Sequence, residues 1–184
     1  MCCKKIIIAA VKGDDSFEEA LTSPCRHVFL LKANINTAKQ MVERCHNAGK
    51  RVYIHIDLAE GFGKDEASLQ YISREVKPDG IISTRINVIR IARDLGLKTV
   101  FRVFLIDAQS MELALINIEK THPDFVELMP GIAYEAIKTL KERSEANVIA
   151  GGFLRTRENL DSAFEVGAFA CSTSNLSLWK TEYQ

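Results

Sequence analysis

The sequence predicts an α/β protein folded as a (β/α)8 barrel, the TIM-barrel fold. Three observations lead to this prediction. Short apolar runs rich in β-branched residues recur along the chain, stretches with helical spacing separate them, and the strand–helix unit has a nearly constant length. With 184 residues the chain is short for this fold, so we expect trimmed helices and one domain that covers residues 1–184.

Eight apolar runs are the candidate strands. Each is four to eight residues long, as buried parallel strands usually are. In chain order they cover residues 6–11, 27–32, 52–58, 80–84, 99–106, 125–130, 148–151 and 169–174.

Helical patterns occupy the segments between these runs. Residues 37–48 have their apolar side chains at i, i+3, i+4 and i+7, the spacing of one buried helix face. In residues 111–119 we expect Leu113, Ala114 and Ile116 to form the buried face. The expected helix N-caps are Ser16, which fits a capping box with Glu19, and Asn36, Ser110 and Asn175.

Glycines mark the ends of three helical stretches. Gly49, Gly96 and Gly167 each precede a strand, at the position where a left-handed residue closes a helix. The interval from Gly49 to Gly96 is 47 residues and that from Gly96 to Gly167 is 71 residues. Two and three units of about 23.5 residues fill these intervals, and eight such units fill the chain.

An open, doubly wound sheet is the alternative to the barrel. Such sheets usually have five or six strands, and many carry a glycine-rich loop after the first strand. Residues 11–15, VKGDD, follow the first strand here and do not form such a loop. The barrel is therefore favoured.

Composition and charge exclude several classes of protein. The chain is 47% hydrophobic and 26% charged, which is enough for a packed core and unlike a disordered chain. The 24 basic and 24 acidic residues balance, which argues against a generally basic nucleic-acid coat. The longest apolar run has six residues, far below the roughly 18 that a membrane helix needs. Five cysteines without a secretory signal favour a reduced, cytoplasmic protein that does not bind a membrane.

A polar cluster is expected at the carboxyl ends of the middle strands, where barrels of this kind carry their functional residues. In residues 52–58, alternation should turn Ile54, Ile56 and Leu58 toward the helices and the other parity inward. Charged residues in mid-strand avoid the apolar helix layer. The predicted cluster consists of His55, Asp57, Arg85, Arg102 and Glu127. Two interpretations stay open: Arg102 and Glu127 form a purely structural ion pair, or Glu127 or Asp57 accepts hydrogen bonds from ligand hydroxyls.

A phosphate site is predicted at the last two strands. Glycines allow a backbone to approach an anion closely, and many barrels bind phosphate at these two loops. The predicted phosphate-binding residues are Gly151, Gly152, Ser172, Thr173 and Ser174, with Gly131 in a third loop beside them. The ligand should therefore be a small phosphate ester with hydroxyl groups.

The residues alone do not decide between an enzyme and a sensor. A Schiff-base aldolase needs an inward lysine, and Lys32 is the one lysine near a predicted strand end. An isomerase could use Glu127 or Asp57 with His55. No metal-ligand pattern is evident, since none of the cysteines has the Cys-x-x-Cys spacing.

Several motifs, in matching order from residue 6 to about residue 179, carry a resemblance to a known family. They are HIDLAEG at 55–61, KPDGIISTR at 77–85, ELMPG at 127–131, AGG at 150–152, and STSN at 172–175 followed by Trp179. With these motifs the chain resembles the glycerol-3-phosphate responsive antiterminators. The resemblance implies a cytoplasmic bacterial regulator without catalytic turnover or cofactor. It also implies that the protein binds glycerol 3-phosphate and the leader of a glycerol-uptake messenger RNA, which lets transcription pass a terminator.

The RNA-binding surface is weakly marked in the sequence. The candidates are basic residues, which supply the salt-dependent part of RNA affinity: Lys64, Arg90, Arg93, Arg155 and Arg157. Arg155 and Arg157 follow the seventh strand, so they are also candidates for the phosphate. We expect the loop at residues 59–66 to close over the ligand, which would complete an RNA surface or favour a homodimer.

Overall fold

Eight parallel strands close into a barrel in chain order, with β8 paired to β1. The computed structural model describes residues 5–181 and 183. The strands are β1 (Ile6–Val11), β2 (His27–Leu30), β3 (Arg51–His55), β4 (Gly80–Ser83), β5 (Lys98–Phe104), β6 (Phe125–Met129), β7 (Val148–Gly151) and β8 (Ala170–Thr173). The predicted (β/α)8 barrel is confirmed.

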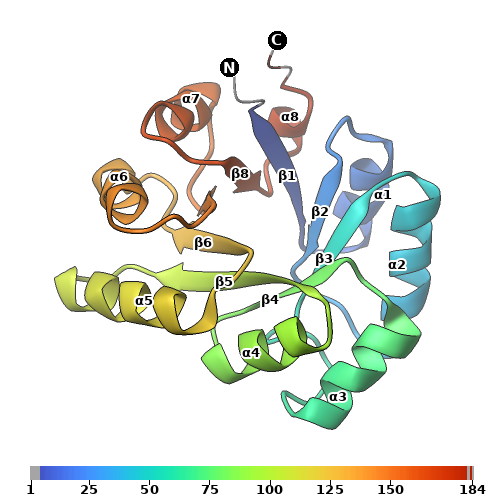
Figure 1. The fold of residues 1–184 in the computed structure, drawn as a ribbon. Coiled ribbons are helices and arrows are strands. Elements are labelled where there is room, and N and C mark those ends of the chain that lie inside the picture. Colours follow the sequence, from blue (N-terminus) through green and yellow to red (C-terminus); the bar gives the residue numbers. More distant parts are fainter. Residues whose placement is uncertain (1–4, 182, 184) are drawn as a thin grey trace.

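The helices surround the barrel (Figure 1). They are α1 (Asp14–Thr22), α2 (Ala38–Asn47), α3 (Glu66–Tyr71), α4 (Ile86–Asp94), α5 (Ala108–Thr121), α6 (Tyr134–Arg143), α7 (Arg157–Glu165) and α8 (Leu176–Trp179). A short π-helical turn, Ile72–Val76, extends α3. Within the described residues, no helix is long and apolar enough to cross a membrane.

The predicted glycine ends are confirmed. Gly49, Gly96 and Gly167 have φ values of 69°, 80° and 95°, directly after α2, α4 and α7. A side chain with a Cβ is strained in this left-handed region, so glycine is the residue that ends these helices at low free-energy cost.

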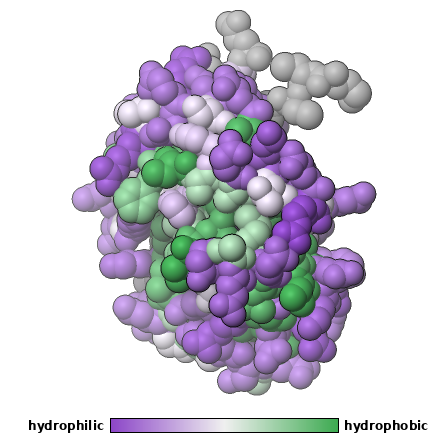
Figure 2. Space-filling model, turned by 90° about the vertical axis from the view of Figure 1, so that its left-hand side faces the viewer, coloured by the Kyte–Doolittle hydropathy of each residue, from purple (hydrophilic) through white to green (hydrophobic). Residues whose placement is uncertain are grey.

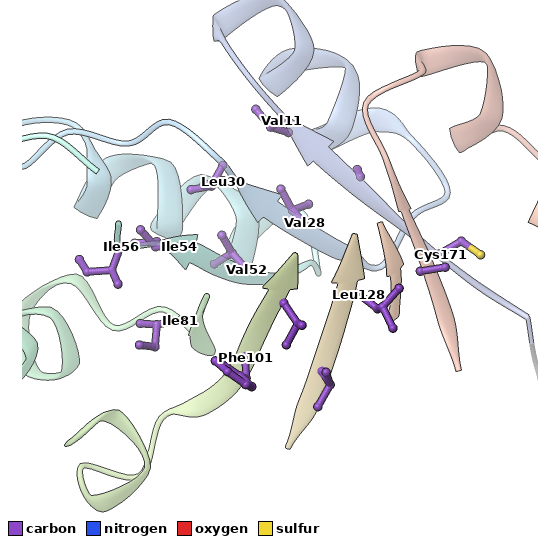
Figure 3. Close-up of a cluster of buried hydrophobic side chains, with 14 of the residues drawn as sticks. Val11, Val28, Leu30, Val52, Ile54, Ile56, Ile81, Phe101, Leu128 and Cys171 are labelled. Carbon is purple, nitrogen blue, oxygen red and sulfur yellow. The ribbon is translucent and has the colours of Figure 1, made fainter. Parts of the chain in front are cut away.

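Alternation along the strands divides the core into two parts. Outward-facing side chains pack against the helices, as Val52, Ile54 and Ile56 do in the cluster of Figure 3. Inward-facing side chains fill the amino-terminal half of the barrel with an apolar plug: Ile8, Phe29, Tyr53, Ile82, Val100, Ile149 and Ala170. The plug seals this end, so the polar inward-facing residues lie toward the carboxyl ends of the strands.

The predicted burial of three side chains, Leu58, Leu113 and Ile116, is wrong. Leu58 does not face the helices: β3 ends at His55, a turn follows in which the Leu58 N–H donates to the His55 oxygen, and Leu58 is 55% exposed. Helix α5 buries Met111, Ala114 and Ile118, and it leaves Leu113 and Ile116 exposed. The sequence pattern alone is ambiguous there, because apolar side chains cover most of that helix.

The helix N-caps also differ in part from the prediction. Asn175 caps α8, and its Oδ1 accepts from the Ser177 N–H. Ser16 and Ser110 instead stand at the third helical position, where each hydroxyl accepts from the N–H of the true cap, Gly13 or Asp107. Asn36 likewise lies outside α2, which begins after Thr37. A serine at the third position satisfies the same orphan N–H group that Glu satisfies in a capping box.

The described cysteines are free thiols. Cys25, Cys45 and Cys171 are buried, and burial raises the pKa of the Cys171 thiol to about 12 and that of Cys45 to about 11. Such thiols stay protonated and unreactive at neutral pH. Cys2 and Cys3 lie outside the described residues.

Candidate functional site

A cavity of about 400 Å³ opens at the carboxyl end of the barrel. Side chains from β1, β5, β6 and β8 and the loops after β7 and β8 line it. Its charged lining consists of Lys12, Arg102, Glu127 and Arg155. Cationic side chains therefore outnumber carboxylates by two, which complements a doubly charged anion.

Arg102 and Glu127 lie at the base of this cavity. They are opposed in the register of β5 and β6, and the Arg102 Nε donates to the Glu127 Oε2 at 2.7 Å. The Ser172 hydroxyl on β8 donates to the other carboxylate oxygen at 2.5 Å. Glu127 is 1% exposed and Arg102 is 6% exposed. Because both carboxylate oxygens have donors, this buried charge is satisfied, as such charges must be.

The Arg102 guanidinium keeps donors for a ligand. Its Nε serves Glu127, whereas its two terminal nitrogens donate no hydrogen bond within the described part of the chain. Arginine carries five N–H donors in a fixed plane. Since Arg102 lines the cavity, a ligand oxygen there can accept from a guanidinium that Glu127 already holds in place.

Gly151 supplies the space that this arrangement needs. A Cβ at Gly151 would lie 2.5 Å from the Glu127 Oε1 and 2.9 Å from the Ser172 Oγ. Any larger residue would separate Glu127 from Ser172. Gly151 was expected to bind phosphate, but it does not line the cavity, and the structure gives it this supporting position instead.

Gly131 joins two loops of the site. Its N–H donates to the Gly151 oxygen at 2.5 Å and to the Gly152 oxygen at 3.0 Å. A Cβ at Gly131 would lie 2.8 Å from the Gly151 nitrogen, so only glycine permits this approach. Gly131 follows the cis peptide bond between Met129 and Pro130 and lies outside the cavity lining.

The loops after β7 and β8 present backbone donors to the cavity. The N–H groups of Gly152, Phe153 and Ser174 donate no hydrogen bond within the described residues, and all three residues line the cavity. Thr173 lines it too, but its hydroxyl donates to the Leu154 oxygen and accepts from the Asn175 N–H. Thus the Thr173 hydroxyl connects the loop after β7 with the loop after β8. The Ser172 hydroxyl donates to Glu127. Gly152 and Ser174 line the cavity with N–H groups that have no other acceptor in the described residues, so both stay predicted phosphate ligands.

Helix α8 adds little to this site. It has only four residues, and the Asn175 side chain already accepts from the Ser177 N–H and the Ser177 hydroxyl. The Ser177 N–H is therefore not free to donate to a ligand.

Asp57, Ser83, Thr84 and Arg85 form a second polar cluster, separate from the cavity. The Asp57 carboxylate accepts from the Ser83 hydroxyl at 2.8 Å, and from the Thr84 N–H and hydroxyl at 2.7 and 2.9 Å. Burial would raise the pKa of Asp57, but these hydrogen bonds outweigh it and lower the pKa. Arg85 lies 3.6 Å from Asp57 with its side chain 63% exposed. Contrary to the prediction, Asp57 and Arg85 do not join Arg102 and Glu127 in one cluster. The Asp57 carboxylate instead accepts its hydrogen bonds from Ser83 and Thr84.

His55 lies between the two clusters. It is 3% exposed, and its Nδ1 has no hydrogen-bond partner among the described residues. Burial lowers the pKa of His55 to about 4, and the positive charge of Arg102 lowers it further than Asp57 can raise it. His55 is therefore a neutral core residue at neutral pH and is not part of the cavity lining.

Lys12 is a further candidate ligand residue, which was not predicted from the sequence. Lys12 directly follows β1 and lines the cavity with an exposed side chain. In the alternation along β1, Lys12 falls on the same side as Ile8 and Ala10. The strand pattern therefore already predicts that the Lys12 side chain points toward the barrel interior. Among the described residues, no group of three or more His, Cys, Asp or Glu side chains is placed to hold a metal ion.

The basic residues considered for RNA do not form one patch. Arg90 and Arg93 lie on α4, where Arg93 donates to the Thr121 oxygen at 2.6 Å. Arg157 lies on α7, 3.8 Å from Asp161, at a different position around the barrel from α4 (Figure 1). Arg155 differs from the other four because it lines the cavity.

The loop after β3 does not have the contacts of a mobile lid. Phe62 is 5% exposed, and the Lys64 ammonium donates to the Phe62 oxygen at 3.1 Å. The Glu60 N–H donates to the Ala33 oxygen, and the Ile35 N–H donates to the Glu60 oxygen. These bonds fasten the loop to the one after β2, and Lys64 has a structural contact. Closure of this loop over a ligand stays a prediction.

Together, the fold and the site define a (β/α)8-barrel protein with a polar, net positive ligand cavity at the carboxyl end of its strands. The chain belongs to the family of glycerol-3-phosphate responsive antiterminators, whose family model matches residues 7–179.

Two solved structures and one curated sequence relative agree with this membership. The glycerol uptake operon antiterminator regulatory protein of Listeria monocytogenes is 32% identical, with a TM-score of 0.92 and 96% of each chain covered. A glycerol uptake operon antiterminator-related protein of Thermotoga maritima is 30% identical, with a TM-score of 0.86, covering 97% of this chain and 99% of that one. The uncharacterized protein YgcP of Escherichia coli K12 is 33% identical over 94% of this chain and 91% of its own length.

Aldolases are also similar in structure. One of them, QR15, has a TM-score of 0.74 at 14% identity and covers 96% of this chain and 93% of its own. At this identity the likeness shows the shared barrel fold alone.

Proposed function

We propose that the protein binds glycerol 3-phosphate in the carboxyl-end cavity and regulates transcription in response to it. The observation that carries this proposal is the chemistry of the cavity: a net positive lining with free guanidinium donors, free backbone N–H groups and one held carboxylate. A phosphate monoester is a dianion at neutral pH, and charge-assisted hydrogen bonds are the strong ones. The name of the family points to the same ligand.

The two ends of the ligand would contact different parts of the cavity. The phosphate would lie against the backbone of Gly152 and Ser174, near Arg155 and Lys12. The glycerol hydroxyls would lie against Arg102 and Glu127, which can respectively donate to them and accept from them. Under this proposal, Glu127 has a ligand contact as well as its structural ion pair.

We further propose that the ligand-bound protein binds the leader of a glycerol-uptake messenger RNA and lets transcription pass a terminator. The names of the family and of the Listeria relative support this step. The protein would act where transcripts are made, in the cytoplasm. No cofactor takes part in this account, and the ligand is the only small molecule that it requires.

Calorimetric titration tests the ligand, with glycerol and inorganic phosphate as the comparison compounds. We expect glycerol 3-phosphate to bind at least tenfold more tightly than either, because each comparison compound lacks one half of the contacts. Glu127→Gln should weaken the binding of glycerol 3-phosphate and leave that of inorganic phosphate unchanged. Equal affinity for all three compounds would contradict the proposed site.

Fluorescence anisotropy with a labelled leader transcript tests the RNA step. The transcript should bind more tightly when glycerol 3-phosphate is present, and by thermodynamic linkage the ligand should bind more tightly when RNA is present. An RNA affinity that does not change with the ligand would contradict the regulatory coupling.

The alternative considered from the sequence, a phosphosugar isomerase or aldolase, has no specific observation in its favour. Lys32, the lysine considered for a Schiff base, lines the neighbouring cleft and does not line the cavity. Lys12 lines both the cleft and the cavity, and its side chain is exposed to solvent.

A further inference from the structure

Phe153 combines an exposed ring with an unusual backbone conformation. Its φ is 59°, in the left-handed region that bulky residues rarely adopt, and it is 62% exposed. An exposed ring gains little apolar burial that would compensate for this conformation. The position of Phe153 is therefore poorly explained by folding stability, although the residue lines the rim of the cavity.

The backbone holds the Phe153 ring outward. On one side, the Gly131 N–H donates to the Gly152 oxygen at 3.0 Å. On the other side, Leu154 is 3% exposed, and its oxygen accepts from the Thr173 hydroxyl at 2.9 Å. With both neighbours fixed, the ring is presented to solvent by a rigid turn.

Arg155 connects this ring to the cavity. Its guanidinium carbon lies 5.5 Å from the centre of the Phe153 ring, a cation–π arrangement, and Arg155 also lines the cavity. Its oxygen accepts from the Asn175 side chain at 2.9 Å, which fixes the backbone. Within the described part of the chain, the guanidinium has no carboxylate partner. Its charge is available both to the cavity and to a group on the ring.

Apolar side chains are also exposed on one side of the barrel. In the view toward the side of the barrel that carries α5, α6 and α7, apolar residues gather in a central hollow surrounded by hydrophilic ones (Figure 2). Exposed large apolar residues from this part of the chain are Phe104, Ile106, Leu113, Ile116, Ile132 and Phe153. Such a patch on an otherwise polar surface indicates a contact site.

We propose that Phe153 and Arg155 form a stacking platform for an unpaired RNA base, and that Arg155 contacts the ligand phosphate on its other side. This inference rests on the proposed function. Proteins recognise unpaired RNA bases by stacking them on aromatic rings and arginine guanidinium planes, and this pair supplies both. The cation beside the ring favours a polyanion over a second copy of the chain, because an apolar self-contact would gain nothing from an unpaired positive charge.

The platform gives a physical route from ligand to RNA. In the absence of ligand, the long Arg155 side chain can leave the ring at little free-energy cost, because no carboxylate in the described residues holds it. A phosphate in the cavity would fix the guanidinium between the two sites. RNA affinity would then rise with ligand because one flexible cation has been ordered before RNA binds.

The test is anisotropy with the labelled leader transcript at saturating glycerol 3-phosphate, using Phe153→Leu, Phe153→Tyr and Phe169→Leu. Phe169 is a matched control: it is 41% exposed and lies just before β8, at the amino-terminal end of the barrel. Phe153→Leu should weaken RNA binding about tenfold, the effect of one lost stack. Phe153→Tyr and Phe169→Leu should bind RNA like the wild type.

Three results would overturn the platform. Wild-type RNA affinity in Phe153→Leu would remove it while leaving the proposed function intact. Loss of self-association in Phe153→Leu by sedimentation, with RNA binding unaffected, would assign the surface to a contact between copies. A wild-type protein that binds no transcript at saturating ligand would overturn the proposed RNA function, and the platform with it.

Discussion

Two polar clusters lie at the carboxyl ends of the strands, one around Asp57 and one around Glu127. The sequence pattern places both carboxylates on the inward parity and offers either as a ligand acceptor. In the structure, the Ser83–Thr84 turn surrounds Asp57 with three hydrogen bonds, outside the cavity. Glu127 instead holds Arg102, whose remaining donors line the cavity. The difference shows that the surroundings of a carboxylate, more than its parity, decide whether it can serve a ligand.

The largest expected effect comes from breaking the Glu127 cluster. Arg102→Met should lower the free energy of unfolding by about 3–5 kcal/mol, because it leaves a buried carboxylate without its cation. Urea unfolding measures this loss. The double variant Arg102→Met, Glu127→Gln should recover most of it, since the buried charge is gone. A loss below about 1 kcal/mol in the single variant would show that Glu127 is less isolated than its 1% exposure indicates.

Breaking the Asp57 cluster should lower the free energy of unfolding and leave the affinity for the ligand unchanged. Asp57→Ala removes the acceptor for the Thr84 N–H and two hydroxyls, which should cost about 1–3 kcal/mol in urea unfolding. Calorimetric affinity for glycerol 3-phosphate should stay within twofold of the wild type. If Asp57→Ala weakens the ligand as much as Glu127→Gln does, the contrast between the clusters is wrong.

His55 predicts a pH dependence of stability. Its pKa is about 4 in the folded protein, below the ordinary value of 6.5, so between these values the unfolded chain binds more protons. Stability must therefore fall as the pH falls through this window, by about 2 kcal/mol from pH 7 to pH 5. The pKa of Asp57 is also lowered, so Asp57 affects the free energy of unfolding only at more acidic pH. There, protonation of the carboxyl in the folded protein removes its stabilising contribution. His55→Asn should flatten the urea-unfolding profile between pH 5 and 7, and an unchanged slope would contradict the assignment.

Lys12 should have the smallest effect, because it is exposed. Lys12→Gln should weaken glycerol 3-phosphate binding about fivefold, the effect of one solvent-exposed charge-assisted hydrogen bond. The matched control is Lys32→Gln, which changes a lysine in the neighbouring cleft and should bind the ligand like the wild type. Equal losses in the two variants would indicate a general electrostatic effect, without a specific contact from Lys12.

The barrel could be predicted because its signals are local and repeated. Glycines at the helix ends, apolar strands and a regular unit length each follow from backbone geometry, and the structure confirms them. The end of β3 was harder to predict. The apolar run in the sequence continues through Leu58, but β3 ends at His55. The chain turns there, and the Asp57 carboxylate accepts a hydrogen bond from the Thr84 N–H in the turn after β4.

The site could be predicted in its location and less well in its detail. Ser172 lies two strands from Glu127 along the barrel, and only the closed register shows that their side chains meet across Gly151. The exclusion of any side chain at Gly151 is equally a property of the assembled site. Lys12 was within reach of prediction, because alternation along β1 already pointed it inward.

A crystal structure of the protein soaked with glycerol 3-phosphate would show where the ligand binds. We expect a phosphate within about 3 Å of the backbone N–H groups of Gly152 and Ser174, with the glycerol hydroxyls toward Arg102 and Glu127. Ligand density at the Asp57 cluster or at the amino-terminal end of the barrel, or an empty cavity at saturating ligand, would contradict it.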